Sequence, residues 1–244
     1  MKKLYVSALL YSFVQLQAIE IIDILALLPL PDDQMCSQYC QDNFIDTLIT
    51  RKKENGFFVD IGAHDGKKWS NSYFFEKVRN WNGICIEPIQ EVYQELVKNR
   101  TVLCICGGVS SYDGIAEFYR VQGEPEQLSG LVSTYHPDHK NRMSYEIRRD
   151  NGGLEIQLIP VFTLNTILEN YKVFSVDYLS VDTEGSEFEI IKAIDFDRFH
   201  IQVMSIENTH HGQALRDFLK SKGFTFVARL FNCDDIFINT KQVQ

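Results

Sequence analysis

The chain has 244 residues, 45% of them hydrophobic and 23% charged, which suits one large domain with a sizeable buried core. Its formal net charge is −9, and its basic runs, at 51–53, 67–68 and 148–149, are short and scattered. A nucleic-acid partner, which a basic stripe would indicate, is therefore not expected.

The first 36 residues are set apart from the domain, which we expect over residues 37–244. Two lysines at the start precede an apolar run, as in a signal peptide. Glu20 and Asp23 lie in the continuation of this run and argue against a membrane-spanning helix. The apolar spacing fits an amphipathic helix about as well, so we expect an extra helix packed on the domain. A signal or membrane anchor through residues 4–28 is the alternative.

Beyond this segment, strand-like and helix-like stretches alternate. We expect helices at 38–49, 70–78, 88–98, 163–170, 187–193 and 211–221, and strands at 57–61, 83–86, 102–105, 178–181, 203–206, 224–230 and 236–239. This alternation predicts a mostly parallel sheet with helices on both faces. The last two strands are joined by a short turn, which predicts one antiparallel edge strand.

Residues 115–121 and 154–159 also alternate apolar and polar positions, as strands do. The stretch over 122–153 is polar, rich in turn residues, and interrupts the strand–helix alternation. It is long enough to be a functional loop that acts as a lid or as a substrate wall.

A glycine-rich turn follows the first strand, in the sequence FVDIGAHDG at 58–66. Ligands of such sheets bind beyond the carboxyl ends of the strands, so this turn lies at the expected ligand site. Neither phosphate-binding glycine pattern is present, and Asp60 and Asp65 would repel a pyrophosphate. S-adenosylmethionine fits better, because it has a positive centre and no phosphate. We expect Asp60 to face its cationic end and Gly62 to let the backbone approach it.

Two further acids end strands at the same edge of the sheet. Glu87 ends the second strand and is expected to accept hydrogen bonds from ribose hydroxyls. The alternative is that Glu87 only caps the helix that Pro88 begins. Asp182 ends a later apolar strand, whereas Glu187 is expected to stabilise the start of the next helix.

Six segments carry a resemblance to one family: SQYCQD at 37–42, FVDIGAHDG at 58–66, SNS at 70–72, CIEP at 85–88, SVDTEGSE at 180–187 and IEN at 206–208. Together they resemble the FkbM family of S-adenosylmethionine-dependent methyltransferases. The resemblance covers roughly residues 37–239. It implies a class I methyltransferase (Rossmann-like) fold, a three-layer α/β sandwich whose mostly parallel seven-stranded sheet has an antiparallel last strand.

The resemblance also implies an activity and a set of site residues. The activity is methyl transfer to oxygen, with a sugar or other small-molecule hydroxyl as the acceptor. Carried over to this sequence, the residues that bind S-adenosylmethionine are Asp60, Gly62, His64, Gly66, Glu87 and Asp182. Glu184 would lie beside the methyl group with Asp182. His64 has a structural role in the turn as its alternative.

An alcohol acceptor needs a base to take its proton. Asp182 is one candidate, and His210 and His211, which follow a strand end at the same edge, are the others. The alternative for both histidines is a helix N-cap region. Asp182, Glu184 and Glu207 could bind a cation, but their spacing is not diagnostic and no metal is expected.

The sequence departs from the family pattern at two places, and the second departure leaves the identity of the base open. Cys40 stands where a glycine is common, and Asn-Thr-His-His at 208–211 stands where a Glu-His-Asn type of sequence is common. The alternative function is a non-catalytic binding or interaction module that keeps the fold without turnover, with the N-terminal helix as its docking element. A nicotinamide dehydrogenase is disfavoured because G-x-G-x-x-G is missing.

The cysteines indicate which cellular compartment the protein occupies. Cys85, Cys104 and Cys106 lie in apolar, strand-like runs, where cysteine is usually a small buried hydrophobe. Cys36 and Cys40 lack the second ligand pair of a zinc site. We therefore expect a cytoplasmic, reducing location, with a secreted or membrane-anchored protein as the alternative. The expected partner is a small-molecule acceptor, such as a glycan or natural product, with membrane contact only through the N-terminal segment.

Overall fold

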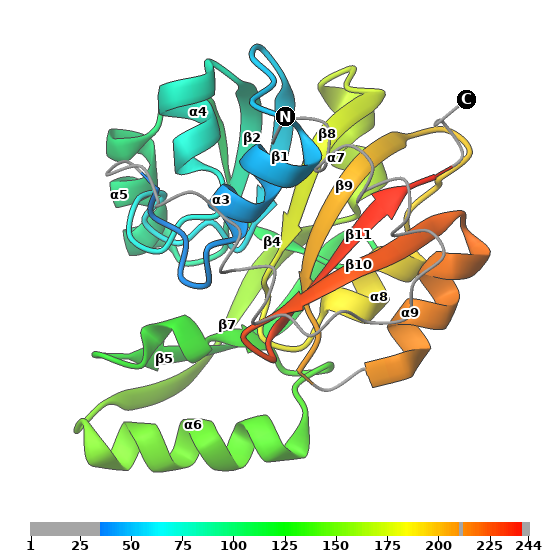
Figure 1. The fold of residues 1–244 in the computed structure, drawn as a ribbon. Coiled ribbons are helices and arrows are strands. Elements are labelled where there is room, and N and C mark those ends of the chain that lie inside the picture. The colour runs from blue at the N-terminus through cyan, green and yellow to red at the C-terminus, as the bar shows by residue number, and fades with distance from the viewer. Residues whose placement is uncertain (1–34, 210–211, 241–244) are drawn as a thin grey trace.

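The structure is a computed structural model that describes residues 35–209 and 212–240. At its centre is a seven-stranded sheet with the order β10-β11-β9-β8-β1-β2-β3 (Figure 1). The strands are β1 Phe57–Ile61, β2 Asn82–Glu87, β3 Leu103–Cys106, β8 Ser175–Val181, β9 His200–Glu207, β10 Phe224–Leu230 and β11 Asp234–Asn239. Each overlaps a strand expected from the sequence, and the mostly parallel sheet is confirmed.

The last strand, β11, is antiparallel to both of its neighbours, β9 and β10, as predicted. It lies between them, however, so the edge strand on this side is β10, which runs in the same direction as the rest of the sheet. The expected position of the antiparallel strand at the edge itself was wrong. The tight turn after β10 folds the chain back toward the centre of the sheet rather than away from it.

Helices cover both faces of the sheet, which confirms the three layers. Phe58 of β1 packs against one layer and its neighbour Val59 against the other, because successive strand residues point to opposite faces. The layer on the Phe58 side contains α3 Gln41–Phe44, α4 Tyr73–Arg79 and α5 Gln90–Asn99. The layer on the Val59 side contains α7 Leu164–Asn170, α8 Glu187–Lys192 and α9 Gly212–Ser221.

The helix starts show how far local sequence determines structure. Thr163 caps α7 as predicted, since its side chain accepts from the Thr166 backbone N–H. The helix expected from residue 70 begins only at Tyr73, although Ser70 Oγ accepts from the Tyr73 backbone N–H. The helix expected at 38–49 is short: α3 passes into a π-helical turn at Ile45–Ile49.

The two alternating segments form strands outside the main sheet. They are β5 Gly114–Gln122 and β7 Gly153–Phe162, which pair antiparallel in a second sheet with β4 Gly108–Val109 and β6 Gly130–Leu131. The order of this sheet is β4-β7-β5-β6, and it lies below the main sheet in Figure 1.

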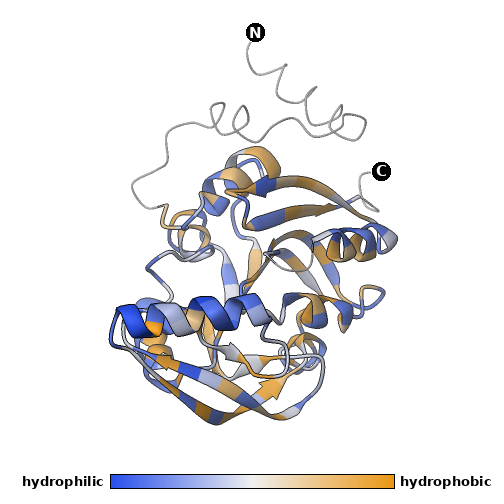
Figure 2. Ribbon diagram, turned by 90° about the horizontal axis from the view of Figure 1, so that it is seen from below, coloured by the Kyte–Doolittle hydropathy of each residue, from blue (hydrophilic) through white to orange (hydrophobic). Residues whose placement is uncertain are grey.

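The stretch at 122–153, expected to be a loop, contains the 13-residue helix α6 Pro137–Arg149. Proline at its first position and the His136 side chain, which accepts from the Asp138 backbone N–H, begin this helix. Figure 2 shows it as the long, mostly hydrophilic helix. Only a narrow apolar stripe of this helix, which includes Met143 and Ile147, packs inward. Because the rest of the helix is polar, the composition of the stretch did not predict a helix.

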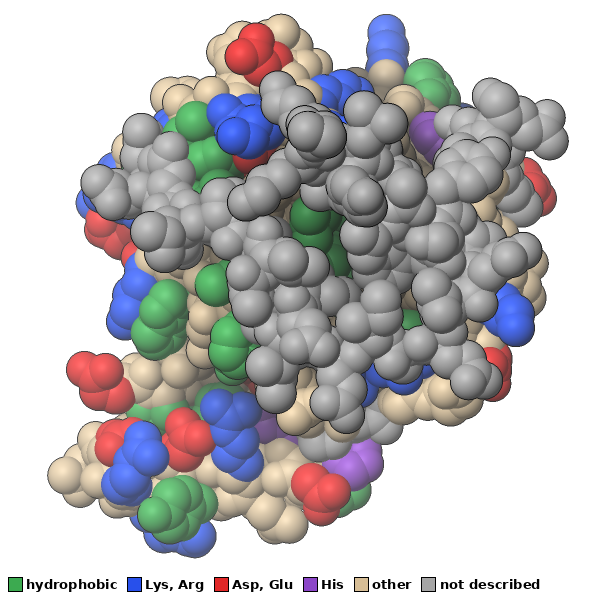
Figure 3. All heavy atoms as spheres, in the orientation of Figure 1, with side chains coloured by type: hydrophobic (Ala, Val, Ile, Leu, Met, Phe, Trp, Pro, Cys, Tyr) green, Lys and Arg blue, Asp and Glu red, His purple; other side chains and the backbone are tan. Residues whose placement is uncertain are grey.

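The N-terminal segment expected to form an extra helix, a signal or an anchor lies outside the described residues. Within the described residues, no helix is both long and apolar enough to cross a bilayer. On the face drawn in Figure 3, acidic and basic side chains of the described residues are interspersed.

Candidate functional site

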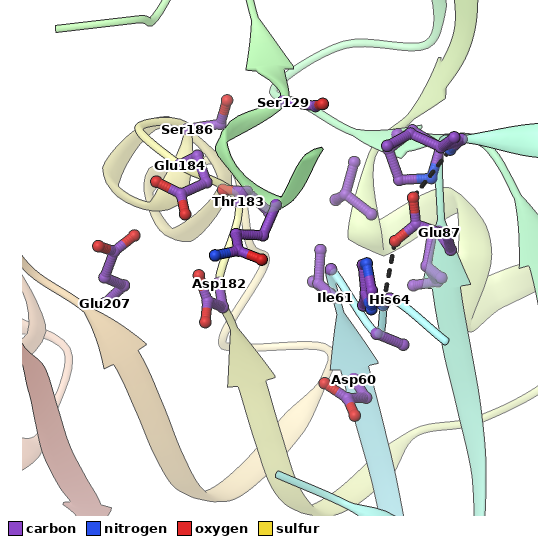
Figure 4. Close-up of a pocket in the computed structure, with 18 of the residues that line it drawn as sticks. Asp60, Ile61, His64, Glu87, Ser129, Asp182, Thr183, Glu184, Ser186 and Glu207 are labelled. Atoms are coloured by element: carbon purple, nitrogen blue, oxygen red, sulfur yellow. Dashed lines mark hydrogen bonds between the residues drawn. The ribbon is translucent and has the colours of Figure 1, made fainter. Parts of the chain in front are cut away.

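A pocket lies at the carboxyl ends of β1, β2, β8 and β9 (Figure 4). β1 has β2 on one side and β8 on the other, so the strand order changes direction here, where ligands bind in open α/β sheets. The second sheet supplies another wall, from the 3₁₀ turn Glu126–Leu128 and from β6. The stretch that contains α6 thus contributes a pocket wall, as expected, through Ser129 and Arg142.

Asp60 lies one residue from the end of β1, lines the pocket and is only 3% exposed. Ser72 Oγ donates a hydrogen bond of 2.5 Å to its carboxylate. Burial raises the pKa of Asp60, while Ser72 and the Arg100 guanidinium oppose that rise. The Asp60 carboxylate is therefore a buried hydrogen-bond acceptor at the pocket, and Ser72 already holds it in place.

Sequence reasoning missed Arg100, whose side chain is fully buried. It donates to Ser72 Oγ and to the Gly66 carbonyl, both at 3.0 Å, and to the Glu76 carboxylate. Although burial opposes it, the Arg100 guanidinium lowers the pKa of Glu76 to about 2. Arg100 thus joins the end of the glycine-rich turn to the serine that holds Asp60.

Asn71 is a second residue to which the sequence assigned no role. It lines the pocket and is 7% exposed, and its amide nitrogen donates to Ser180 Oγ at 3.0 Å. Its side-chain oxygen is buried with no hydrogen-bond partner among the described residues. A buried acceptor without a donor is costly, and a ligand N–H or O–H would satisfy it.

The two glycines of the turn have different roles. Gly62 lines the pocket at φ +84°, and a Cβ there would lie 1.8 Å from the Asp182 carbonyl oxygen. Gly66, at φ +75°, is not among the lining residues, and a Cβ there would lie 2.4 Å from a Leu96 methyl carbon. The packing of α5 against the turn accounts for Gly66, and its expected role at the donor stays a prediction.

Glu87 fits both of its interpretations. Its carboxylate accepts from the Ile89 backbone N–H at 2.8 Å, at the start of α5, and from the His64 backbone N–H at 3.0 Å. It also lines the pocket. Burial raises the pKa of Glu87 to about 7, and the Glu126 carboxylate adds to this rise. Each carboxylate oxygen keeps a lone pair for a further donor.

His64 lines the pocket with a backbone φ of +50°, so the turn does shape its conformation. Its Nε2 lies 3.3 Å from a carboxylate oxygen of Glu126 in the 3₁₀ turn. His64 therefore connects the glycine-rich turn to the wall built by the second sheet. This contact supports a structural role beside the expected one at the donor.

Asp182, Glu184 and Glu207 converge in the pocket, with carboxylate oxygens within 4.8 Å of one another (Figure 4). Asp182 and Glu184 lie in the turn after β8, and Glu207 ends β9. Burial and the neighbouring carboxylates raise the pKa of Asp182 and of Glu207 well above the usual range. Burial likewise raises the pKa of Glu184 to about 8. Three acids placed in this way can accept hydrogen bonds from hydroxyl groups or bind a cation.

The backbone of this acidic turn is held tightly. Glu184 has a φ of +59°, which is costly for a residue with a Cβ. Glu187 accepts from the backbone N–H groups of Thr183 and Gly185, at 2.9 and 3.0 Å, which gives it the structural role expected. His139 of α6, missed by sequence reasoning, places Nε2 2.7 Å from a Glu184 carboxylate oxygen. Burial lowers the pKa of His139.

Of the three candidate bases, the structure places Asp182 in the pocket. His210 and His211 lie outside the described residues. Glu207 and Asn208 precede them at the end of β9, so the chain leaves the sheet at the pocket edge before the two histidines.

The sequence matches the Methyltransferase FkbM domain family over residues 60–226. This span is more than half of the chain. The chain belongs to the FkbM methyltransferase family. Its fold is the expected class I methyltransferase sandwich, and its cofactor is S-adenosylmethionine. No curated protein matches the sequence.

The chain is similar to several solved structures. The methyltransferase FkbM from Methylobacillus flagellatus KT is 14% identical with a TM-score of 0.45, over 79% of this chain and 47% of its own. The chain thus spans about half the length of that protein. TrmK from M. capricolum, in complex with S-adenosylhomocysteine, is 11% identical with a TM-score of 0.44, over 82% and 68%. A methyltransferase from Geobacter sulfurreducens is 12% identical with a TM-score of 0.42, over 89% and 93%.

Proposed function

We propose that this FkbM domain transfers the methyl group of S-adenosylmethionine to a hydroxyl oxygen of a sugar or similar polyhydroxylated small molecule. The observation that carries the proposal is the convergence of Asp182, Glu184 and Glu207 in the pocket. Carboxylates accept hydrogen bonds from neighbouring hydroxyls. Trp69 lines the same pocket and is 47% exposed, and an exposed indole suits the apolar face of a sugar ring.

The donor would lie across the ends of β1 and β2. The unpartnered oxygen of Asn71 and the carboxylate of Asp60 would receive its ammonium group. The remaining lone pairs of Glu87 would receive the ribose hydroxyls. Gly62 lines the pocket between these two ends, and its missing side chain makes room for the Asp182 carbonyl oxygen.

In the reaction, the acceptor oxygen forms a bond to the methyl carbon as the carbon–sulfur bond breaks. The electron pair of that bond goes to sulfur, and the hydroxyl proton goes to a carboxylate. Asp182 is the proposed acceptor of the proton, directly or through water. The positive donor would lower the raised pKa values of these acids, because an opposite charge favours their ionised form. His210 and His211 remain candidates for the same step.

The decisive experiment is a screen of sugars and other alcohols with an isotopically labelled methyl donor. Transfer of label to oxygen, located in the product, supports the proposal. Trp69→Ala should then raise the KM for the acceptor and leave donor affinity unchanged. Donor binding without transfer to any hydroxyl would refute O-methylation. No thermal shift with S-adenosylmethionine or S-adenosylhomocysteine would favour the non-catalytic binding module instead.

A further inference from the structure

We propose that β7 of the second sheet pairs, edge to edge, with the same strand of a second copy of this chain, so that the protein is a symmetric dimer. The proposal does not depend on the proposed reaction. It rests on an open strand edge, on the apolar side chains along it, and on the register in which this strand matches itself.

The open edge comes from the sheet topology. On one side, β7 pairs with β5 along its whole length, from Gly153 to Val161. On the other side, β4 pairs with it only at Val161 and Phe162. Among the described residues, no strand pairs with residues 153–160 on that side. Half of the backbone N–H and C=O groups of this stretch therefore point outward without a strand partner.

The exposed side chains of this stretch are apolar. Leu154, Ile156 and Leu158 share one face of the strand, and they are 46, 58 and 72% exposed. Proteins commonly guard a free edge with charged side chains, proline or a bulge, and the proline of this stretch, Pro160, lies at its end. Glu155 is the single charged residue between Gly153 and Pro160. An edge of this length and composition is a template for another strand.

The sequence of the edge, GLEIQLIP, favours its own copy as that strand. In an antiparallel pair with the two-fold axis at Ile156, Leu154 of each copy faces Leu158 of the other. Glu155 then faces the uncharged Gln157, so the apolar pairs form and no like charges oppose each other. With the axis at Glu155, the Glu155 carboxylates of the two copies would face each other. With the axis at Gln157, the two Gln157 amides would.

The location of the edge permits such pairing. β5, β7 and α6 extend away from the main sheet in Figure 1. Residues 153–160 are not among those that line the pocket. A dimer through this edge therefore leaves both pockets open, and the four-stranded sheet of each copy continues into that of the other.

The test is the molar mass of the full chain in solution, measured by sedimentation equilibrium over a range of concentrations. We expect twice the 28.2 kDa of one chain. Ile156→Lys should give a monomer, because the axis brings the two ammonium groups together. Circular dichroism and donor binding would show that the variant is folded. A wild-type monomer at all concentrations would overturn the proposal.

Two further variants test the register. Leu154→Lys alone should weaken the dimer, and Leu154→Lys with Leu158→Glu on the same chain should restore it, because opposite charges then face each other twice. Ile115→Lys is the matched control: Ile115 is 61% exposed on β5, one strand away from the edge. A failure of the double variant to restore the dimer would overturn this register. Equal loss of the dimer in Ile115→Lys would show packing between sheet faces and overturn edge pairing.

Discussion

Glu87→Gln is the substitution that most directly tests the donor site. Glutamine keeps the shape of the side chain but replaces one oxygen by an amide nitrogen, which donates hydrogen bonds and cannot accept them. In the structure the two carboxylate oxygens accept from Ile89 and His64, at 2.8 and 3.0 Å. The variant must therefore leave one backbone donor unpaired or lose an acceptor for a ribose hydroxyl. A hydrogen bond to a charged group contributes roughly 1.5–3 kcal/mol. Donor affinity should fall on the order of 10- to 100-fold.

The pKa of Glu87 adds a second, independent signature. Burial raises this pKa to about 7 in the protein without donor. The ionised form offers more acceptor capacity to the ribose, so it binds the donor better than the protonated form. The contribution of Glu87 to affinity should therefore grow as the pH rises through about 7 and level off above it. In Glu87→Gln this part of the pH dependence should disappear.

The assay is calorimetric titration with S-adenosylhomocysteine, which has the ribose but not the sulfonium charge, between pH 6 and 8.5. The matched control is Glu91→Gln, since Glu91 lies in the first turn of the following helix with a side chain that is 75% exposed. An affinity and a pH profile in Glu87→Gln equal to those of the wild type would refute the assignment of Glu87 to the ribose.

Three further outcomes are expected. Asp182→Asn should lower kcat by a larger factor than donor affinity, because its interaction strengthens in the transition state; a stable, fully active variant would contradict this. Arg100→Met should lower the free energy of unfolding by about 3–5 kcal/mol, because Glu76 and Asp60 lose their buried cation. Denaturant titration measures this, and an unchanged midpoint would show that Arg100 does not stabilise these two carboxylates. All six cysteines, free in the structure, should react with a thiol reagent after denaturation without reductant, and two or more protected thiols would indicate a disulfide.

Features set by neighbouring residues could be predicted from the sequence. β1 has the predicted bounds, Phe57–Ile61, because a dense apolar run ends at a glycine turn. Thr163 caps its helix through a contact three residues away. Glu87 and Asp182 could be placed in the pocket because parallel strands end at one edge of the sheet.

Features that depend on distant contacts could not be predicted. Arg100 reaches Ser72 from 28 residues away, and no local pattern marks it as a partner of the donor turn. His139 meets Glu184 only because α6 folds back over the acidic turn. Gly66 shares a motif with Gly62, yet the packing of Leu96 decides its role. Sequence spacing alone cannot tell a glycine that packs against a neighbouring strand end from one that packs against a helix.

The acids of the pocket and the charge of the donor should be coupled through protons. In the protein without donor, burial raises the pKa of Glu184 to about 8, and burial with neighbouring carboxylates raises the pKa values of Asp182 and Glu207 well above the usual range. These carboxyl groups therefore keep their protons to a higher pH than ordinary carboxyl groups do. A sulfonium nearby lowers these pKa values, so binding must release protons.

S-adenosylhomocysteine lacks the sulfonium charge and should release fewer protons than S-adenosylmethionine. Calorimetry at pH 7 in two buffers of different ionisation enthalpy measures the number released by each. In Asp182→Asn the difference between the two ligands should shrink, because one coupled carboxyl is gone. Equal proton release by both ligands in the wild type would show that the sulfonium does not lie near these acids. The donor would then be oriented with its methyl group away from Asp182, and that residue could not serve as the base.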